Sequence, residues 1–118
     1  MHYWFQEEKR RKFLEESEDK EILIISHFDT DGITSAAIFS SCLKRLDKNF
    51  SLRIVKQLEK EVIDSLPQEP ILIFLDLGSG NLKDLSKLKN EIYIIDHHEI
   101  DKDLAVKINL NIINPHLF

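Results

Sequence analysis

Three short apolar segments of this chain each end in aspartate or histidine. They cover residues 22–25, 71–75 and 92–95 and are rich in isoleucine and leucine. Such runs predict strands that are buried on both faces, as in a parallel sheet covered by helices. The carboxyl ends of parallel strands share one edge, where sheets of this kind bind ligands. The polar residues that follow the segments are therefore expected to meet: His27, Asp29, Asp31, Asp76, Asp96, His97 and His98.

The rest of the sequence alternates between strand-like and helix-like patterns. Strands are expected over about 22–27, 51–56, 71–76, 91–96 and 108–113, and helices over about 32–47, 59–66 and 81–89. The second strand has Leu52 and Ile54 against Arg53 and Lys56, which indicates the edge of the sheet. In this order the last two strands follow each other directly. The pattern predicts an α/β fold with a doubly wound, mostly parallel sheet of about five strands and helices on both faces.

Size and composition exclude several classes of protein. At 118 residues, with 42% hydrophobic and 31% charged residues, the chain is expected to form a single soluble domain. The net charge of −5 gives no overall basic footprint for nucleic acid. No apolar stretch approaches the ~20 residues that span a bilayer, so no membrane association is expected. Cys42 has no partner for an internal disulfide, which favours a reducing, cytoplasmic location.

Residues 1–20 differ in character from the rest and predict a charged N-terminal helix before a domain over 21–118. The aromatic cluster Tyr3, Trp4 and Phe5 comes first, and Phe13 follows at helical spacing. This helix is expected to pack on the sheet or on a partner. The basic residues 9–12 are flanked by glutamates, so a solvated helix face is favoured over a phosphate-binding patch.

Each polar strand end has an ordinary structural interpretation when it is considered alone. Asp31 could be a helix N-cap, Asp76 could cap a turn, and His27 could be a strand-end histidine with a hydrogen-bond partner. Residues 96–98 could be a simple loop. None of these interpretations explains why all three strand ends carry such residues. Two carboxylates ~4 Å apart repel by ~4 kcal/mol at an effective dielectric of ~20, and a divalent cation reverses the sign.

Carboxylates with imidazoles favour Mn²⁺ or Mg²⁺ over zinc, and Cys42, in the middle of a predicted helix, offers no thiolate. A site for two such ions suits phosphoester hydrolysis. Asp76 follows the central predicted strand and is the natural bridging ligand. Residues 78–80, Gly-Ser-Gly, either approach a phosphate through their backbone or form a plain turn.

Together these residues resemble the motifs of the DHH phosphoesterase superfamily. The triplet stands at residues 96–98, the motif His-x-Asp-x-Asp-Gly at 27–32, and the single aspartate after an apolar strand at Asp76. Within the superfamily the chain is most similar to the archaeal RecJ-like proteins, including the GINS-associated nuclease. That likeness is carried by residues 25–34, 54–57, 76–80 and 114–118.

The resemblance implies Mn²⁺- or Mg²⁺-dependent cleavage of single-stranded nucleic acid from the 5′ end, with DNA favoured over RNA. It also implies a role in replication or repair and a GINS-type partner. By the family pattern, one ion would be held by His27 and Asp29, and the other by Asp31 and His97, with Asp76 bridging. His98 would lie near the scissile phosphate, and Asp96 would orient its neighbours.

The family pattern also includes a fourth aspartate motif and a smaller C-terminal domain. Asp101 and Asp103 do not match that motif, so the sequence is expected to be part of a DHH domain and to be inactive by itself. An exposed sheet edge could also let the chain self-associate. Two alternative functions stay open, a phosphoesterase for short oligonucleotides, cyclic dinucleotides or nucleotide phosphates, and a non-catalytic replisome interaction module.

Overall fold

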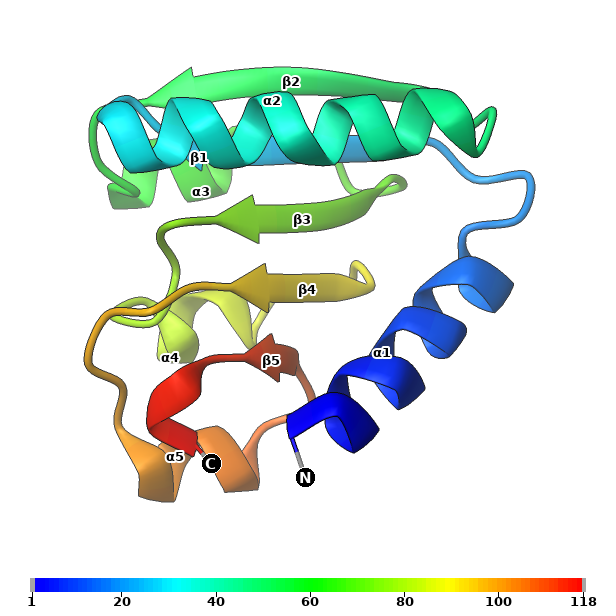
Figure 1. The fold of residues 1–118 in the computed structure, drawn as a ribbon. Coiled ribbons are helices and arrows are strands. Elements are labelled where there is room, and N and C mark those ends of the chain that lie inside the picture. The colour runs from blue at the N-terminus through cyan, green and yellow to red at the C-terminus, as the bar shows by residue number, and fades with distance from the viewer. Residues whose placement is uncertain (1, 118) are drawn as a thin grey trace.

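A five-stranded parallel sheet forms the centre of the molecule, with the strand order β2-β1-β3-β4-β5 (Figure 1). The computed structural model describes the backbone of residues 2–117 and the side chains of residues 7–117. The strands are β1 (Ile22–His27), β2 (Phe50–Val55), β3 (Ile71–Leu75), β4 (Ile92–Ile95) and β5 (Asn111–Ile113). The helices are α1 (His2–Glu16), α2 (Thr30–Arg45), α3 (Lys60–Asp64), α4 (Leu82–Leu85) and α5 (Lys102–Lys107), followed by the 3₁₀ turn η1 (Pro115–Leu117). The predicted α/β fold is confirmed.

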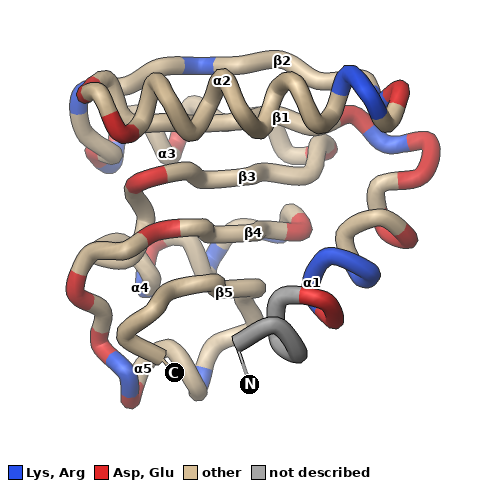
Figure 2. Tube along the Cα trace, viewed as in Figure 1, with Lys and Arg blue, Asp and Glu red and all other residues tan. Residues whose placement is uncertain are grey.

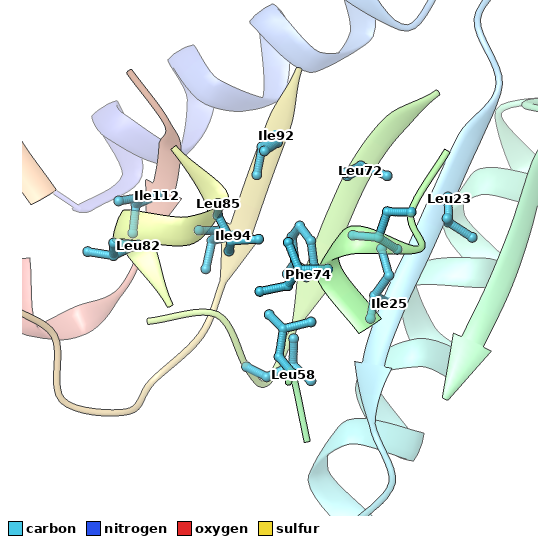
Figure 3. Packing of buried hydrophobic residues seen from close by; sticks show 13 residues of the cluster. Leu23, Ile25, Leu58, Leu72, Phe74, Leu82, Leu85, Ile92, Ile94 and Ile112 are labelled. Carbon is cyan, nitrogen blue, oxygen red and sulfur yellow. The ribbon is translucent and has the colours of Figure 1, made fainter. Parts of the chain in front are cut away.

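The alternation of side chains along each strand divides the core into two layers. On one face of the sheet, Ile24 and Ile73 belong to a buried cluster that includes Leu43 of α2 and Phe13 of α1. On the other face, Phe74 belongs to a cluster that packs under α3, α4 and α5 (Figure 3). All five residues of β3 are buried, as expected for a strand covered by helices on both sides.

Helix α1 docks on the sheet through its C-terminal half. The Phe13 ring meets Tyr93 of β4 edge to face at 5.3 Å and Phe39 of α2 at 6.2 Å. Of the two places expected for the charged N-terminal helix, the sheet or a partner, this contact shows the sheet. The side chains of Tyr3, Trp4 and Phe5 lie outside the described residues.

The connection between β4 and β5 differs from the sequence prediction. A strand over 108–113 directly after β4 is wrong, because α5 intervenes and β5 covers only Asn111–Ile113. The Asp101 side chain caps α5 by accepting a hydrogen bond from the Leu104 N–H at 3.1 Å. A crossover is required here, since parallel neighbours cannot be joined by a tight turn. This helix was not predicted because the segment 101–107 is too short and too polar to show a helical pattern of apolar residues.

The order of the strands positions the candidate site. Successive connections from β1 run outward to β2 on one side and through β3 to β5 on the other, so the direction of winding reverses between β1 and β3. At such a reversal the loops that leave two neighbouring strands diverge and open a crevice at the carboxyl edge. The loops after β1 and β3 begin with the predicted ligands. In residues 2–117, no helix has the length and apolar character needed to cross a membrane.

Candidate metal centre

The aspartates and histidines predicted from the sequence meet at the carboxyl edge of the sheet. Figure 2 shows the acidic segments that follow β1, β3 and β4 along the left side of the view, where the strand arrows of Figure 1 end. Two overlapping groups of ligand atoms arise there, and within each group the atoms lie within 4.8 Å of one another. One group is His27, Asp29 and Asp76, and the other is Asp76, Asp96, His97 and His98.

Asp76 belongs to both groups and is the centre of the site. It is only 4% exposed and follows the fully buried strand β3. Its backbone has φ of 61°, in the left-handed region that aspartate tolerates better than most residues. Its N–H donates to the Ile95 carbonyl at 3.0 Å, which ties this turn to the end of β4. The Asp76 carboxylate thus lies between the end of β1 and the end of β4.

The first group has the geometry of neighbouring ligands around one cation. His27 Nδ1 lies 2.9 Å from Asp29 Oδ2 and 3.7 Å from Asp76 Oδ2. Two ligands at right angles, ~2.1 Å from one Mg²⁺, would be about 3 Å apart. Among the described residues, neither His27 Nδ1 nor Asp76 Oδ2 has a hydrogen-bond partner, although both are buried. Unpaired, converging polar atoms of this kind fit a divalent ion.

The second group surrounds the other oxygen of Asp76. His97 Nε2 lies 2.7 Å from Asp76 Oδ1 and 3.9 Å from Asp31 Oδ2. Asp31 is largely exposed and lies outside both compact groups, but it faces His97 from the first turn of α2. The ring of His98 stacks on that of His97 with centroids 4.4 Å apart. His97 is therefore positioned between Asp31 and the buried Asp76.

Asp96 makes hydrogen bonds within the protein with both of its oxygens. Oδ1 lies 2.6 Å from His98 Nδ1 and accepts from the His97 N–H at 2.8 Å, and Oδ2 accepts from the Ser79 N–H at 3.2 Å. Burial alone would raise the pKa of Asp96, but these hydrogen bonds outweigh it and lower the pKa. The bond to Asp96 in turn raises the pKa of His98.

The other two carboxylates have opposite electrostatic surroundings. Burial, followed by the neighbouring Asp29, raises the pKa of Asp76, while His97 opposes this change. The Gly32 N–H is the main cause that lowers the pKa of Asp29. A buried carboxylate beside a second one is costly without a cation, and a divalent ion between them would remove the cost.

The N-cap of α2 is Asp29, whereas the sequence suggested Asp31 for this role. Asp29 Oδ1 accepts from the Gly32 N–H at 2.8 Å, which leaves Oδ2 facing His27. Gly32 is required because a Cβ here would lie 2.0 Å from the His27 carbonyl oxygen. The glycine lets α2 begin in contact with the end of β1. The motif His-x-Asp-x-Asp-Gly thereby brings the side chains of His27 and Asp29 close together.

Three buried polar residues that the sequence did not single out hold the site loops. The Ser26 hydroxyl donates to the Gly32 carbonyl at 2.7 Å, between β1 and α2. Asn114 is fully buried, and its Nδ2 donates to Ser79 Oγ and to the His98 carbonyl, both at 2.9 Å. A polar residue directly after the last strand, in Asn114-Pro115, was the available signal for Asn114.

The sequence matches a known protein family over most of its length. The model of the DHH family, N-terminal domain, matches residues 21–117. The chain belongs to the DHH family. An uncharacterized protein of Methanocaldococcus jannaschii is 40% identical over 103 residues, covering 82% of this DHH chain and 24% of that protein. YorK of Bacillus subtilis, provisionally named a single-strand DNA-specific exonuclease, is 33% identical over 81 residues, covering 63% of this chain and 14% of its own length.

Solved structures show the same fold. Exonuclease RecJ bound to manganese matches with a TM-score of 0.76 and 22% identity, over 90% of this chain and 30% of that one. RecJ of Thermus thermophilus in complex with Mn²⁺ matches with a TM-score of 0.65 and 24% identity, over 90% of this chain and 16% of that one. The DHH chain thus spans less than a third of each of these relatives.

Proposed function

We propose that this DHH chain forms the metal-binding part of a RecJ-like exonuclease that shortens single-stranded DNA from the 5′ end, in replication or repair. The observation that carries the proposal is the position of Asp76. Its carboxylate is buried between His27 and His97, with one oxygen toward each histidine. A carboxylate placed to bridge two groups of ligands suits a two-ion phosphodiesterase.

The residues divide into two sets around Asp76. We assign His27 and Asp29 to one Mn²⁺ or Mg²⁺ ion, Asp31 and His97 to the other, and Asp76 to both. Support comes from the separations of 2.9 Å between His27 and Asp29 and 3.9 Å between Asp31 and His97. Oxygen-rich ligand sets that include imidazole suit Mn²⁺, while Mg²⁺ suits the carboxylates.

The remaining two residues act on the substrate side of the proposed mechanism. When bound, a pair of divalent ions supplies an activated water and neutralises charge on the phosphate. Asp96 fixes the His98 ring through Nδ1 and favours its protonated form. The half-exposed His98 can therefore donate a proton or a hydrogen bond to a phosphate oxygen or leaving group beside the ligands.

The substrate and the partner are inferred from the relatives. YorK carries a name that specifies single-strand DNA, and two RecJ structures contain manganese. We therefore favour single-stranded DNA over RNA and over small phosphoesters, which stay the second candidate. A GINS-type partner is an expectation from the sequence resemblance, and the aromatic residues 3–5 that would carry it have side chains outside the described part of the chain.

An exonuclease assay tests this function. The complete protein is incubated with Mn²⁺ and three substrates, a 5′-labelled single strand, the same strand in a duplex, and a dinucleotide. We expect release of label from the single strand first and a loss of at least a hundredfold in rate for Asp76→Asn, which keeps the shape and tolerates the positive φ. Asp103→Asn, an exposed change on α5, is the matched control and should retain activity.

The outcomes separate the candidates. Faster hydrolysis of the dinucleotide would support the small-substrate phosphoesterase instead. Full activity in Asp76→Asn would reject the assignment of the site. The same assay on the 118-residue chain alone tests the sequence-based expectation that these residues are inactive without further parts.

A further inference from the structure

We propose that the outer edge of β2 is a self-complementary interface through which two copies of this chain join their sheets. β2 is the edge strand beside β1, and in the described part of the chain no strand pairs with its other side (Figure 1). Leu52 and Ile54 are 42% and 44% exposed there. This surface is distinct from the metal centre and does not depend on the proposed nuclease function.

The edge has few of the features that normally prevent strands from pairing. Its six residues keep an unbroken register with β1, from Ile22 opposite Phe50 to His27 opposite Val55. The strand contains no proline, no glycine and no bulge, and Arg53 is its single charged residue. Natural sheets usually protect an edge by one or more of these devices. The opposite edge, β5, has three residues and is followed at once by η1.

The unpaired backbone groups of β2 belong to every second residue. Ile22 N–H donates to the Asn49 carbonyl, so residues 49, 51 and 53 direct their backbone groups toward β1. The N–H and C=O groups of Phe50, Leu52 and Ile54 consequently point outward. These same residues carry their side chains on the α2 face, because Leu52 lies beside Ile24 of the cluster packed under α2.

A twofold axis perpendicular to the sheet at Leu52 satisfies both constraints. It pairs Leu52 with its own copy and Phe50 with Ile54, so that every outward backbone group gains a partner in an antiparallel ladder. The apolar side chains meet on the α2 face, and Arg53 lies opposite Ser51 on the other face. Isologous contacts of this kind close as dimers.

Charge disfavours the neighbouring register that is centred on Arg53. An axis at Arg53 would set the two arginines directly opposite each other, which is unfavourable for like charges on neighbouring strands. In the register centred on Leu52, Lys48 and Lys56 of opposite copies meet only beyond the strand ends. We therefore expect the dimer to tighten as salt screens that repulsion. One edge strand from each copy forms the contact, so we expect a weak dimer with a dissociation constant on the order of micromolar.

Sedimentation equilibrium of the 118-residue chain measures this association. We expect a monomer–dimer equilibrium, and at least a tenfold weaker one in Leu52→Lys, which places two ammonium groups across the axis. Val106→Lys, the same kind of change at an 80% exposed position of α5, is the control and should dimerise like the wild type. Circular dichroism confirms that both variants fold. A monomer at all concentrations, or a dimer unaffected by Leu52→Lys, would overturn the proposal.

Cysteine pairs then test the register, in a Cys42→Ser background because Cys42 is exposed. Ser51→Cys and Arg53→Cys occupy opposing, non-hydrogen-bonded positions in the proposed ladder, where Cα atoms are ~4.5 Å apart. A mixture of the two variants should cross-link under mild oxidation several-fold faster than either alone. Fastest cross-linking of Arg53→Cys with itself would reject the register centred on Leu52.

Discussion

At the scale of single residues, backbone shape and chemistry coincide at the candidate metal centre. Asp76 has a positive φ that favours aspartate, asparagine or glycine, and it also supplies the central carboxylate. Gly32 has no side chain because the His27 carbonyl occupies that space. Backbone geometry therefore restricts the residue type at both positions, and at Asp76 the proposed ligand role restricts it further.

The substitution Gly32→Ala tests the steric restriction. A Cβ placed 2.0 Å from a backbone oxygen forces α2 away from β1, so we expect destabilisation of about 3 kcal/mol or failure to fold. Chemical denaturation measures this change. Gly80→Ala is the matched control, since a Cβ there meets no atom within 4 Å, and it should stay within about 0.5 kcal/mol of the wild type. Equal stability of the two variants would contradict the role given to Gly32.

The candidate ligand residues could be predicted from the sequence because they follow apolar runs. The residues that hold their loops in place could not be predicted, because they act through contacts between distant loops. Asn114 meets Ser79 across 35 positions and His98 across 16 positions. Which of Asp29 and Asp31 caps α2 depends on where the helix begins. That start is set by the close approach of Gly32 to β1 and could not be read from spacing.

At the scale of elements, α1 is fixed to the sheet by aromatic packing and by a polar network at its end. Tyr93 donates a hydrogen bond to Glu16 Oε2 at 3.2 Å, and Lys12 donates to Asn111 of β5 at 2.9 Å. Burial, then Glu16, raise the pKa of Tyr93. The network also contains Glu91 beside Glu16. The hydrogen bond with Glu16, then burial, raise the pKa of Glu91.

A stability measurement at two pH values tests this carboxylate pair. Because the folded state raises the pKa of Glu91, it binds a proton more readily than the unfolded chain. The pair thus stabilises the fold below the unfolded pKa, and that stability is lost as the pH rises through the folded pKa. Glu91→Gln should therefore raise the melting temperature by about 2 °C at pH 7, corresponding to roughly 0.5 kcal/mol for a partly exposed pair, and by much less at pH 4.

Glu69→Gln in the exposed loop before β3 serves as the control for that measurement and should leave the melting temperature unchanged at both pH values. A gain for Glu91→Gln that is the same at pH 4 and pH 7 would mean that removal of the charge is not its cause.

Element prediction succeeded where periodicity was strong and failed where an element was short. The buried strands β1, β3 and β4 and the helix α2 were found within a few residues. α5 was missed because its six residues contain one short apolar group, Leu104-Ala105-Val106, between charged residues. β5 was overextended because Ile108 and Leu110 pack on the core from the loop that leads into it.

At the scale of the whole molecule, the sheet order makes the metal centre depend on the complete fold. The ligands come from three neighbouring strands, β1, β3 and β4, which are far apart in sequence. Since an unfolded chain holds no such arrangement, a cation that binds there would stabilise the folded state by an amount that grows with the logarithm of the ratio of its concentration to its dissociation constant. The parallel order itself followed from the alternation of strands and helices, while the pairing of β1 with β3 needed the structure.

Thermal unfolding with and without Mn²⁺ tests this coupling. At a hundredfold excess over the dissociation constant, one ion adds about 2.7 kcal/mol, so the melting temperature should rise by roughly 10 °C and fall again with a chelator. We expect Asp76→Asn to lose most of this shift, while Asp103→Asn keeps it. An equal shift in both variants would place the cation elsewhere.

Asn114 also has a consequence for the order in which the site is assembled. It is the residue that holds the His98 carbonyl and Ser79, yet it follows the triplet by sixteen positions. During synthesis, all seven candidate site residues leave the ribosome before Asn114, which secures the last of their loops. A nascent chain that ends before β5 would contain every site residue, but it would lack the hydrogen bond from Asn114 that holds the loop of residues 96–98. We therefore expect cation capture to follow, rather than guide, completion of the sheet.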